Sequence, residues 1–336
     1  MIKVSSLFVL LLLVSIYARA YNLAPFYDPL DTGFQMQQVL TVVKQQIPLA
    51  MGESRRIFHG RGHCFPGFEH LVIDWFPPYA VARLYKEVEP EWVAELSDTL
   101  KSVDEIEGLV IQQRSRGKEA QQNVAWGSVP EQMNTMELGL FYQVKPQRNQ
   151  NSGLFLDMRE GRRWVMHNAG GKRVLNLFSY TCAFSVAALA GGAEQVVNVD
   201  MSRGAINTGR ENHLLNGLEG DRVKFLAYDL FRSWKRVRQY GPYDLIVIDP
   251  PSFQPGSFVA EKDYRKVIRR LNELTKEGGQ VLACHNDPKN GTEFLKNLML
   301  EECPDFKFVE RLNNPEDFPE AEPEKSLKVL LYVREK

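Results

Sequence analysis

The sequence predicts an α/β fold whose larger part is a doubly wound, mainly parallel sheet, preceded by a smaller α+β domain. The clearest observation is the stretch 173–200, which combines a buried strand, a turn of small and hydroxyl residues, an Ala-rich helix, a Gly-Gly stop and a second apolar strand. This is the pattern of a first βαβ unit, whose turn holds nucleotide-like ligands. The second observation is that strands and helices alternate from there to residue 284, as a parallel sheet with crossover helices requires.

Apolar runs and helical spacing define the elements of this larger domain, residues 148–336. Strands are expected at Val174–Leu177, Val196–Asp200, Val223–Ala227, Leu245–Asp249 and Gln280–Cys284, and helices near Ala183–Ala190, Ser202–Asn216, Arg232–Tyr240 and Glu261–Thr275. A helix near Thr292–Leu300 and two strands, Phe306–Leu312 and Leu327–Val333, follow. The connection between those two strands carries Pro315, Pro319 and Pro323 and no helical pattern, so the last strand is expected to be antiparallel.

Residues 51–147 predict the small α+β domain, in the order strand, strand, helix, strand, strand. The strands are Leu71–Trp75, Ala80–Tyr85, Leu109–Gln113 and Leu138–Gln143, and the helix runs from Pro90 to about Lys101. The polar segment 147–152 lacks periodicity and is expected to be the linker. In residues 21–50, a helix from Phe34 to Gln46 is expected to stop before Pro48.

Composition limits the class of protein. The 336 residues suffice for two domains and a large core. A net charge of −1 excludes a global basic field, so any site for a polyanion must be a local patch. The four cysteines show no CxxC spacing, no disulfide framework and no metal-ligand pattern, which favours a reducing compartment.

Residues 1–20 conflict with that compartment. Lys3 precedes the apolar run 7–14, and Ala18-Arg-Ala20 resembles a signal-peptidase site. The run is too short to span a bilayer, which takes roughly 20 apolar residues. A secretory signal and a spurious extension with no role in the fold are both open. We favour the second and expect a cytoplasmic protein without membrane association.

Two acids follow strands at the sheet edge where ligands bind. Asp200 closes the second strand before Ser202, a good N-cap, and an acid there commonly holds ribose hydroxyls, although helix capping alone is the other interpretation. Asp229 follows the third strand and can bind an adenine amino group. The turn at 178–183 lacks G-x-G-x-x-G, which argues against a dehydrogenase. S-adenosylmethionine (SAM), a cofactor without pyrophosphate, fits better.

The fourth strand ends in Asp249-Pro-Pro-Ser-Phe253. Two consecutive prolines leave carbonyls without competing local N–H groups, so the carbonyl of Pro250 can point into the crevice. Phe253 offers a face on which a flat base can stack. A rigid loop is the simpler interpretation of Pro-Pro, but the position after a buried strand is more specific.

With these motifs the chain resembles the class I SAM-dependent methyltransferases, and among them the bacterial 23S ribosomal RNA base methyltransferases. It is similar both to the cytosine-C5 enzyme and to the guanine-N7 half of the fused large-subunit enzyme. The matching stretches are 153–159, 175–181, 199–203, 216–218 and 249–253, and segment 61–85 resembles the small central domain of the C5 enzyme. The resemblance implies a Rossmann-like seven-stranded methyltransferase sheet, SAM as cofactor and RNA as partner. An amino-terminal RNA-binding PUA domain is expected to be absent or vestigial.

The resemblance also implies roles for individual residues. The cofactor's methionine end is expected near Phe155, Asp157 and Arg159. The protein turn that holds the cofactor is expected to be lined by Ser179, Tyr180 and Thr181. The residues that follow the two acids, Met201 and Leu230, complete the predicted cofactor set. Asp249, Pro250, Phe253 and Asn286 form the predicted catalytic set.

Two positions depart from the family pattern. Cys182 stands where relatives often carry Gly, which puts close backbone approach in doubt. The C5 enzyme presents a nucleophilic Cys after strand five. In this chain, counting from Gly278-Gly279 places Asn286 at the position of that nucleophile, and Cys284 lies two residues earlier, inside the strand. Methylation of cytosine C5 needs a thiolate adduct, whereas base nitrogens do not. The sequence therefore favours N-methylation.

Basic side chains form two groups. Lys262, Arg265, Lys266, Arg269 and Arg270 lie on one side of the helix after the Pro-Pro turn, and Arg159, Arg162 and Arg163 lie at the domain junction. Phosphate binding fits both groups, although helix charges are usually a solvated face. The acidic loop 316–324 is expected to face away from RNA.

The prediction is thus a SAM-dependent methyltransferase acting on an RNA base, in rRNA processing. A methyltransferase for a protein or small molecule stays open, as does a non-catalytic RNA-binding or assembly factor on the same fold. The methylated atom, the target nucleotide and the oligomeric state are not predicted.

Overall fold

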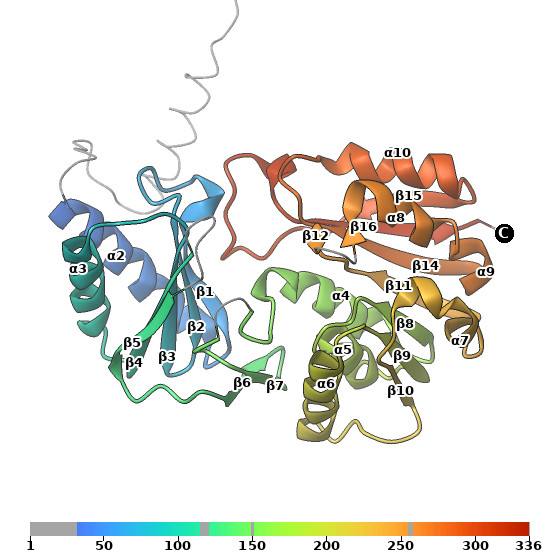
Figure 1. Cartoon of the computed structure of the whole chain (residues 1–336), viewed down its shortest axis with the longest axis horizontal. Helices are drawn as coiled ribbons and strands as arrows, with labels where there is room; N and C mark the ends of the chain where they lie inside the picture. Colours follow the sequence, from blue (N-terminus) through green and yellow to red (C-terminus); the bar gives the residue numbers. More distant parts are fainter. Residues whose placement is uncertain (1–31, 115–120, 149–150, 255–257, 336) are drawn as a thin grey trace, which may run out of the picture.

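The computed structural model describes residues 32–114, 121–148, 151–254 and 258–335. The predictions for residues 1–20 fall outside these ranges. In the described residues no helix is both long and apolar enough to cross a membrane. The chain folds into two sheets with helices around them, joined by a hairpin and by long loops (Figure 1).

The larger sheet has seven strands in the order β10-β9-β8-β11-β14-β16-β15, which confirms the predicted methyltransferase-like α/β fold. The strands are β8 (Arg173–Leu177), β9 (Gln195–Val199), β10 (Val223–Leu226), β11 (Tyr243–Ile248), β14 (Thr275–His285), β15 (Phe306–Arg311) and β16 (Lys328–Arg334). The first five run parallel, and β16 is antiparallel to both β14 and β15, as predicted. The strand order reverses between β8 and β11, which is where open α/β sheets bind ligands.

Helices cover both faces of this sheet (Figure 1). They are α4 (Arg159–Asn168), α5 (Ala183–Ala190), α6 (Arg203–Leu215), α7 (Trp234–Arg238), α8 (Ala260–Ile268), α9 (Leu271–Leu274) and α10 (Thr292–Glu302). Alternate strand residues face opposite sides, because side chains of a strand alternate. Leu175 and Ile246 pack with the apolar residues of α7 to α10, whereas Val174 and Leu245 pack with those of α4 and α5.

The smaller sheet has the order β1-β2-β3-β4-β5 and packs against two helices. Its strands are β1 (Arg55–His59), β2 (Leu71–Phe76), β3 (Tyr79–Leu84), β4 (Gly108–Gln113) and β5 (Gln121–Gly127), and its helices are α2 (Thr32–Ala50) and α3 (Pro90–Lys101). β3 and β4 are parallel, and the other pairs are antiparallel.

The predicted strand Leu138–Gln143 is not part of this sheet. A separate hairpin, β6 (Met133–Glu137) with β7 (Leu140–Val144), occupies this region. Its turn, Leu138-Gly139, has left-handed backbone at both positions, so the prediction counted a turn as strand. The hairpin lies against α6 of the larger domain, where Asn212 Oδ1 accepts the Gln143 N–H at 2.8 Å.

Several predicted helix boundaries are wrong. α2 continues to Ala50 through Pro48, because a proline in the last turn disturbs few helical hydrogen bonds. The predicted helix Glu261–Thr275 is broken into α8 and α9, and Thr275 already begins β14. The predicted helix Arg232–Tyr240 is longer than the observed one. Only α7 is α-helical in this region, and a 3-10 turn at Leu230–Arg232 precedes it. α4 was not predicted at all.

Buried ion pairs join the parts of the chain. Arg162, on α4, donates to both carboxylate oxygens of Glu137, on β6, at 2.6 and 2.8 Å, and both side chains are buried. Arg159, also on α4, pairs with the buried carboxylate of Asp317. These contacts correct the prediction of a phosphate-binding group at the domain junction. Only Arg163 of that group is on the surface, where it pairs with Glu160 at 3.0 Å.

Candidate active site

The turn after β8 is built on left-handed backbone at three alternate residues. Phe178, Tyr180 and Cys182 have φ values of 57°, 45° and 62°. This is the region that favours glycine, so Cys182 holds a backbone conformation that residues with a side chain rarely adopt. The Cys182 side chain is fully buried, and its Sγ would lie 2.5 Å from a Cβ added to Gly209 of α6. The thiol thus packs against α6, while Gly209 makes room for it.

Asp200 lies immediately after β9 with its carboxylate held in place by backbone. The N–H of Tyr180 donates to Oδ2, and the N–H of Ser202 donates to Oδ1, both at 2.8 Å. Ser202 caps α6 with its own side chain, as predicted. Burial raises the pKa of Asp200, while these two N–H groups act in the opposite direction. Each carboxylate oxygen has a second lone pair, so the group can still accept hydroxyl hydrogens.

The other predicted cofactor residues near the ends of β8 and β10 are held by burial and by local hydrogen bonds. Ser179, Thr181 and Leu230 are buried, and Thr181 Oγ1 donates to the carbonyl of Gly153 at 2.7 Å. Asp229 caps the 3-10 turn by accepting the N–H of Phe231 at 2.9 Å.

Apolar surface lies exposed around the turn. The rings of Phe155 and Tyr180 are 5.4 Å apart, and Phe155 is 41% exposed. Met201, directly after Asp200, is 52% exposed. A flat or apolar ligand group can cover such side chains. The exposed apolar groups and the anchored carboxylate together fit an adenosyl cofactor without pyrophosphate.

Three polar side chains meet where β11 and β14 end. Asn286 Nδ2 lies 3.5 Å from Asp157 Oδ2, and the carbonyl of Asn286 accepts a hydrogen bond from Ser252 Oγ at 2.8 Å. Burial, together with the nearby charge of Asp157, raises the pKa of Asp249 to about 7. Burial also raises the pKa of Asp157. The structure therefore brings Asp157 and Asn286 together, with Asp249 within electrostatic range.

The two remaining residues of the predicted catalytic set, Pro250 and Phe253, follow Asp249 along the chain. Pro250 is buried directly after Asp249, whereas Pro251 is exposed. Phe253 begins the short strand β12 (Phe253–Gln254), but its side chain lies outside the described residues, so its stacking role stays a prediction.

The cysteines carry no sign of an activated thiol. Cys284 is fully buried inside β14, and burial raises the pKa of its thiol well above the ordinary value. Burial raises the pKa of Cys182 to about 12, and those of Cys64 and Cys303 to about 11. A nucleophilic cysteine requires the opposite shift.

A cavity of about 480 Å³ opens between the small domain, Asp157, the segment after β14, and the loop 313–327 that connects β15 and β16. Asp157 and Asn286 line one side, and Arg61 and Tyr85 of the small domain line the other. The acidic loop supplies Glu320 to its wall. The acidic loop, which the sequence predicts to face away from RNA, thus borders this cavity.

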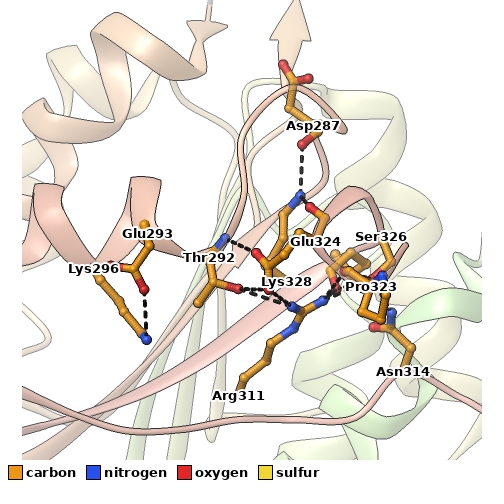
Figure 2. Close-up of polar contacts among 11 residues, drawn as sticks. Asp287, Thr292, Glu293, Lys296, Arg311, Asn314, Pro323, Glu324, Ser326 and Lys328 are labelled. Atoms are coloured by element: carbon orange, nitrogen blue, oxygen red, sulfur yellow. Dashed lines mark hydrogen bonds and ion pairs between the residues drawn. The ribbon is translucent and has the colours of Figure 1, made fainter. Parts of the chain in front are cut away.

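Two cations, half-buried Arg311 and fully buried Lys328, hold the end of that loop in place (Figure 2). Arg311, on β15, donates to Glu324 at 2.8 Å and to the carbonyl of Pro323 at 2.6 Å. Lys328, the first residue of β16, donates to the carbonyls of Asp287 at 2.8 Å and Glu324 at 3.2 Å. Since Asp287 follows Asn286, Lys328 ties the strand end that carries Asn286 to the wall of the cavity.

The basic residues predicted for the helix after the Pro-Pro turn lie on α8 and in the turn between α8 and α9, and most of them pair with carboxylates. Arg265 and Arg269 pair with Glu302 at 2.9 and 2.5 Å. The remaining pairs are Lys266 with Asp263 and Arg270 with Glu273. Lys262 has no carboxylate within ion-pair distance in the described part of the chain. The net positive potential of this helix is therefore smaller than its sequence indicates.

Fold and site together define an enzyme that binds an adenosyl cofactor at the carboxyl edge of a seven-stranded sheet. A family model described as S-adenosylmethionine-dependent methyltransferase matches residues 55–333, and the chain belongs to this family. It is therefore a SAM-dependent enzyme, and SAM is its cofactor.

Relatives and solved structures agree with this family. The chain is 30% identical over 282 residues, covering 80% of this chain and 70% of the relative, to the ribosomal RNA large subunit methyltransferase I of Erwinia tasmaniensis. It is 30% identical over 269 residues, 73% of this chain and 38% of the relative, to the large subunit methyltransferase K/L of Shewanella pealeana. The crystal structure of SMU.776 complexed with SAH superposes with a TM-score of 0.82 at 26% identity, covering 92% of this chain and 83% of that one.

Sequence reasoning missed the cavity residues outside the family motifs. Arg61 stands in the segment that resembles the small domain of the C5 enzyme, so a signal existed, but nothing in the sequence placed it opposite Asn286. Lys328 was missed because it sits in an apolar strand pattern with no visible partner.

Proposed function

We propose that this enzyme transfers the methyl group of SAM to a nitrogen atom of a base in large-subunit ribosomal RNA. The names of the relatives support the substrate class. The convergence of Asp157 and Asn286 at the cavity wall, with Asp249 within electrostatic range of Asp157, supports a planar, polar substrate group. This convergence is the observation on which the proposal depends most.

The cofactor would be held by the residues at the ends of β8, β9 and β10. Asp200 would accept the ribose hydroxyls, and Asp229 with Leu230 would meet the adenine. Phe155 and Asp157 would lie toward the methionine end, Ser179, Tyr180 and Thr181 would line the turn, and Met201 would cover the ribose side. Arg159 stays in this set as a prediction, although its guanidinium is already paired with Asp317. Bound SAM supplies an electrophilic methyl on a positively charged sulfonium.

Asp249, Pro250 and Asn286 would orient the base. The carboxylate of Asp249 and the carbonyl of Pro250 can accept the hydrogens of a base nitrogen, which keeps its lone pair directed at the methyl group. Holding reactants in such geometry can contribute about 7–11 kcal/mol to lowering the barrier. Phe253 would stack on the base.

Nitrogen is proposed as the methylated atom because C5 chemistry lacks a thiolate here. Attack at cytosine C5 needs a cysteine adduct. None of the four cysteines has a lowered pKa, and Cys284 is inside β14. The partner would be RNA, contacted through local basic side chains that include those of α8, and the protein would act in the cytoplasm, where large-subunit RNA is processed.

The test measures methyl transfer and SAM binding by the purified wild-type protein. Tritiated SAM is supplied with protein-free large-subunit rRNA, and in parallel with lysate proteins and with small metabolites. Label in rRNA, mapped to a base nitrogen, is the expected result. Label only in protein or metabolites would favour the first alternative. SAM binding with no transfer to any acceptor would favour a non-catalytic RNA-binding or assembly factor.

A further inference from the structure

Arg61 is a basic side chain of the cavity with an aromatic partner and no acidic one. Its guanidinium carbon lies 4.2 Å from the centroid of the Tyr85 ring. No carboxylate of the described residues lies within ion-pair distance of it. Neighbouring Arg56 differs, since Asp74 accepts its hydrogen bond at 2.8 Å. Arg61 therefore keeps five N–H donors for a ligand.

The surroundings of Tyr85 are electropositive although the whole chain is nearly neutral. Burial would raise the pKa of its hydroxyl, but Arg83, Arg114, Arg61 and Arg56 together lower it. A hydroxyl that is stabilised as an anion marks a place where negative charge is favoured. Stacked arginines on an aromatic ring are also pre-organised for phosphate.

The backbone at Arg61 is fixed by close contact with the acidic loop. A Cβ added to Gly62 would lie 1.8 Å from the carbonyl oxygen of Pro319, so only glycine fits there. The N–H of Ala321 donates to the carbonyl of Gly62 at 2.8 Å. A side chain on such a rigid segment binds its ligand with a smaller entropic cost.

The cavity continues from this pair to Asn286. Its volume of about 480 Å³ falls in the usual range of ligand pockets. Exposed Glu69 and half-buried Glu320 also line it, and their carboxylates repel phosphate and can accept base N–H groups. The cavity wall thus offers a cationic group suited to phosphate, Arg61, and carboxylates suited to the N–H groups of a base.

We propose that Arg61, stacked on Tyr85, binds a backbone phosphate of the RNA strand beside the target nucleotide, whose extruded base occupies the cavity toward Asn286. This inference rests on the proposed function. It adds a phosphate contact on the small domain to the basic side chains of α8.

The test uses the full chain with Arg61→Met, Arg61→Lys and Tyr85→Phe, and a protein-free large-subunit rRNA transcript as the probe. Arg61→Met should raise the RNA dissociation constant about tenfold. The slope of log K against log salt should fall by about 0.7, the loss of one phosphate contact to a single strand. Arg61→Lys should keep the slope and lose part of the affinity, since an ammonium replaces the planar fork. Tyr85→Phe should keep the slope with a smaller loss of affinity.

Arg210→Met is the matched control, because Arg210 is an exposed arginine stacked on Phe225 at 4.4 Å, on α6 and outside the cavity. SAM affinity and the unfolding midpoint should be unchanged in both arginine-to-methionine variants. An unchanged affinity and slope in Arg61→Met, or an equal loss in Arg210→Met, would overturn the inference. Wild-type protein that binds RNA with the predicted Arg61 dependence but methylates no RNA would instead contradict the proposed function alone.

Discussion

Replacing Asp249 by Asn should make the protein more stable at pH 8 and much less active. A pKa of about 7, against the ordinary value of 3.8, means that the folded protein disfavours the ionised carboxyl. At 1.36 kcal/mol per pH unit, the difference amounts to about 4 kcal/mol. The side chain is partly accessible, so about 2–4 kcal/mol is the expected range. Because the folded-state pKa is raised, this stability is present below pH 4 and lost as the pH rises to 7.

Urea unfolding at pH 5 and pH 8 measures this effect. The free energy of unfolding of Asp249→Asn minus that of the wild type should be larger at pH 8 than at pH 5. Asp263→Asn is the control. Burial raises the pKa of Asp263, but the hydrogen bonds from Lys266 and the Val259 N–H and the charges of Lys266 and Lys262 together lower it. Its carboxyl is ionised in both the folded and the unfolded protein from pH 5 to pH 8, so the stability difference of Asp263→Asn should be the same at the two pH values. The wild-type kcat should rise with pH around 7, because an ionised Asp249 accepts base hydrogens. A stability difference that does not change with pH would refute the buried-charge reasoning.

Three further predictions concern the cofactor, the thiol and the loop anchor. Asp200→Asn should weaken SAM binding about tenfold to a hundredfold in calorimetry, because a charged hydrogen-bond acceptor is lost; unchanged affinity would remove Asp200 from the cofactor site. Cys284→Ala should keep kcat within about twofold and cost roughly 1 kcal/mol in unfolding for the small buried void; loss of methyl transfer in the folded variant would restore a C5 mechanism. Lys328→Met should lower kcat about tenfold to a hundredfold with SAM affinity unchanged, because the loop of Asn286 loses its tie to Glu324; wild-type kcat would show that the tie has no catalytic effect.

The strands of the larger sheet could be predicted because they are buried on both faces. Runs such as Leu245–Ile248 are apolar at every position, which only a covered strand requires. The residue types around the second strand also predicted Ser202 as a helix N-cap and Asp200 at the strand end. The structure has both residues in these positions.

Partners distant along the chain were beyond prediction. Arg162 and Arg159 look like surface cations, and their carboxylates lie 25 and 158 residues away. A charged residue in sequence carries no sign of burial until its partner is known, since only pairing makes burial tolerable. Pro48 was misjudged for a related reason, because its effect depends on its position in the helix.

The phosphate contact and the methyl-transfer edge depend on one anchored segment. Gly62 next to Arg61 receives the loop at Pro319 and Ala321, and the same loop ends at the turn that Lys328 ties to Asp287. A displacement of this loop would therefore move the proposed phosphate contact, Arg61, together with the strand end that carries Asn286. Binding of the backbone on one side and positioning of the base on the other would then be coupled through rigid contacts. Such coupling would give the acidic loop a positioning role at the cavity, although its charge alone predicts that RNA would repel it.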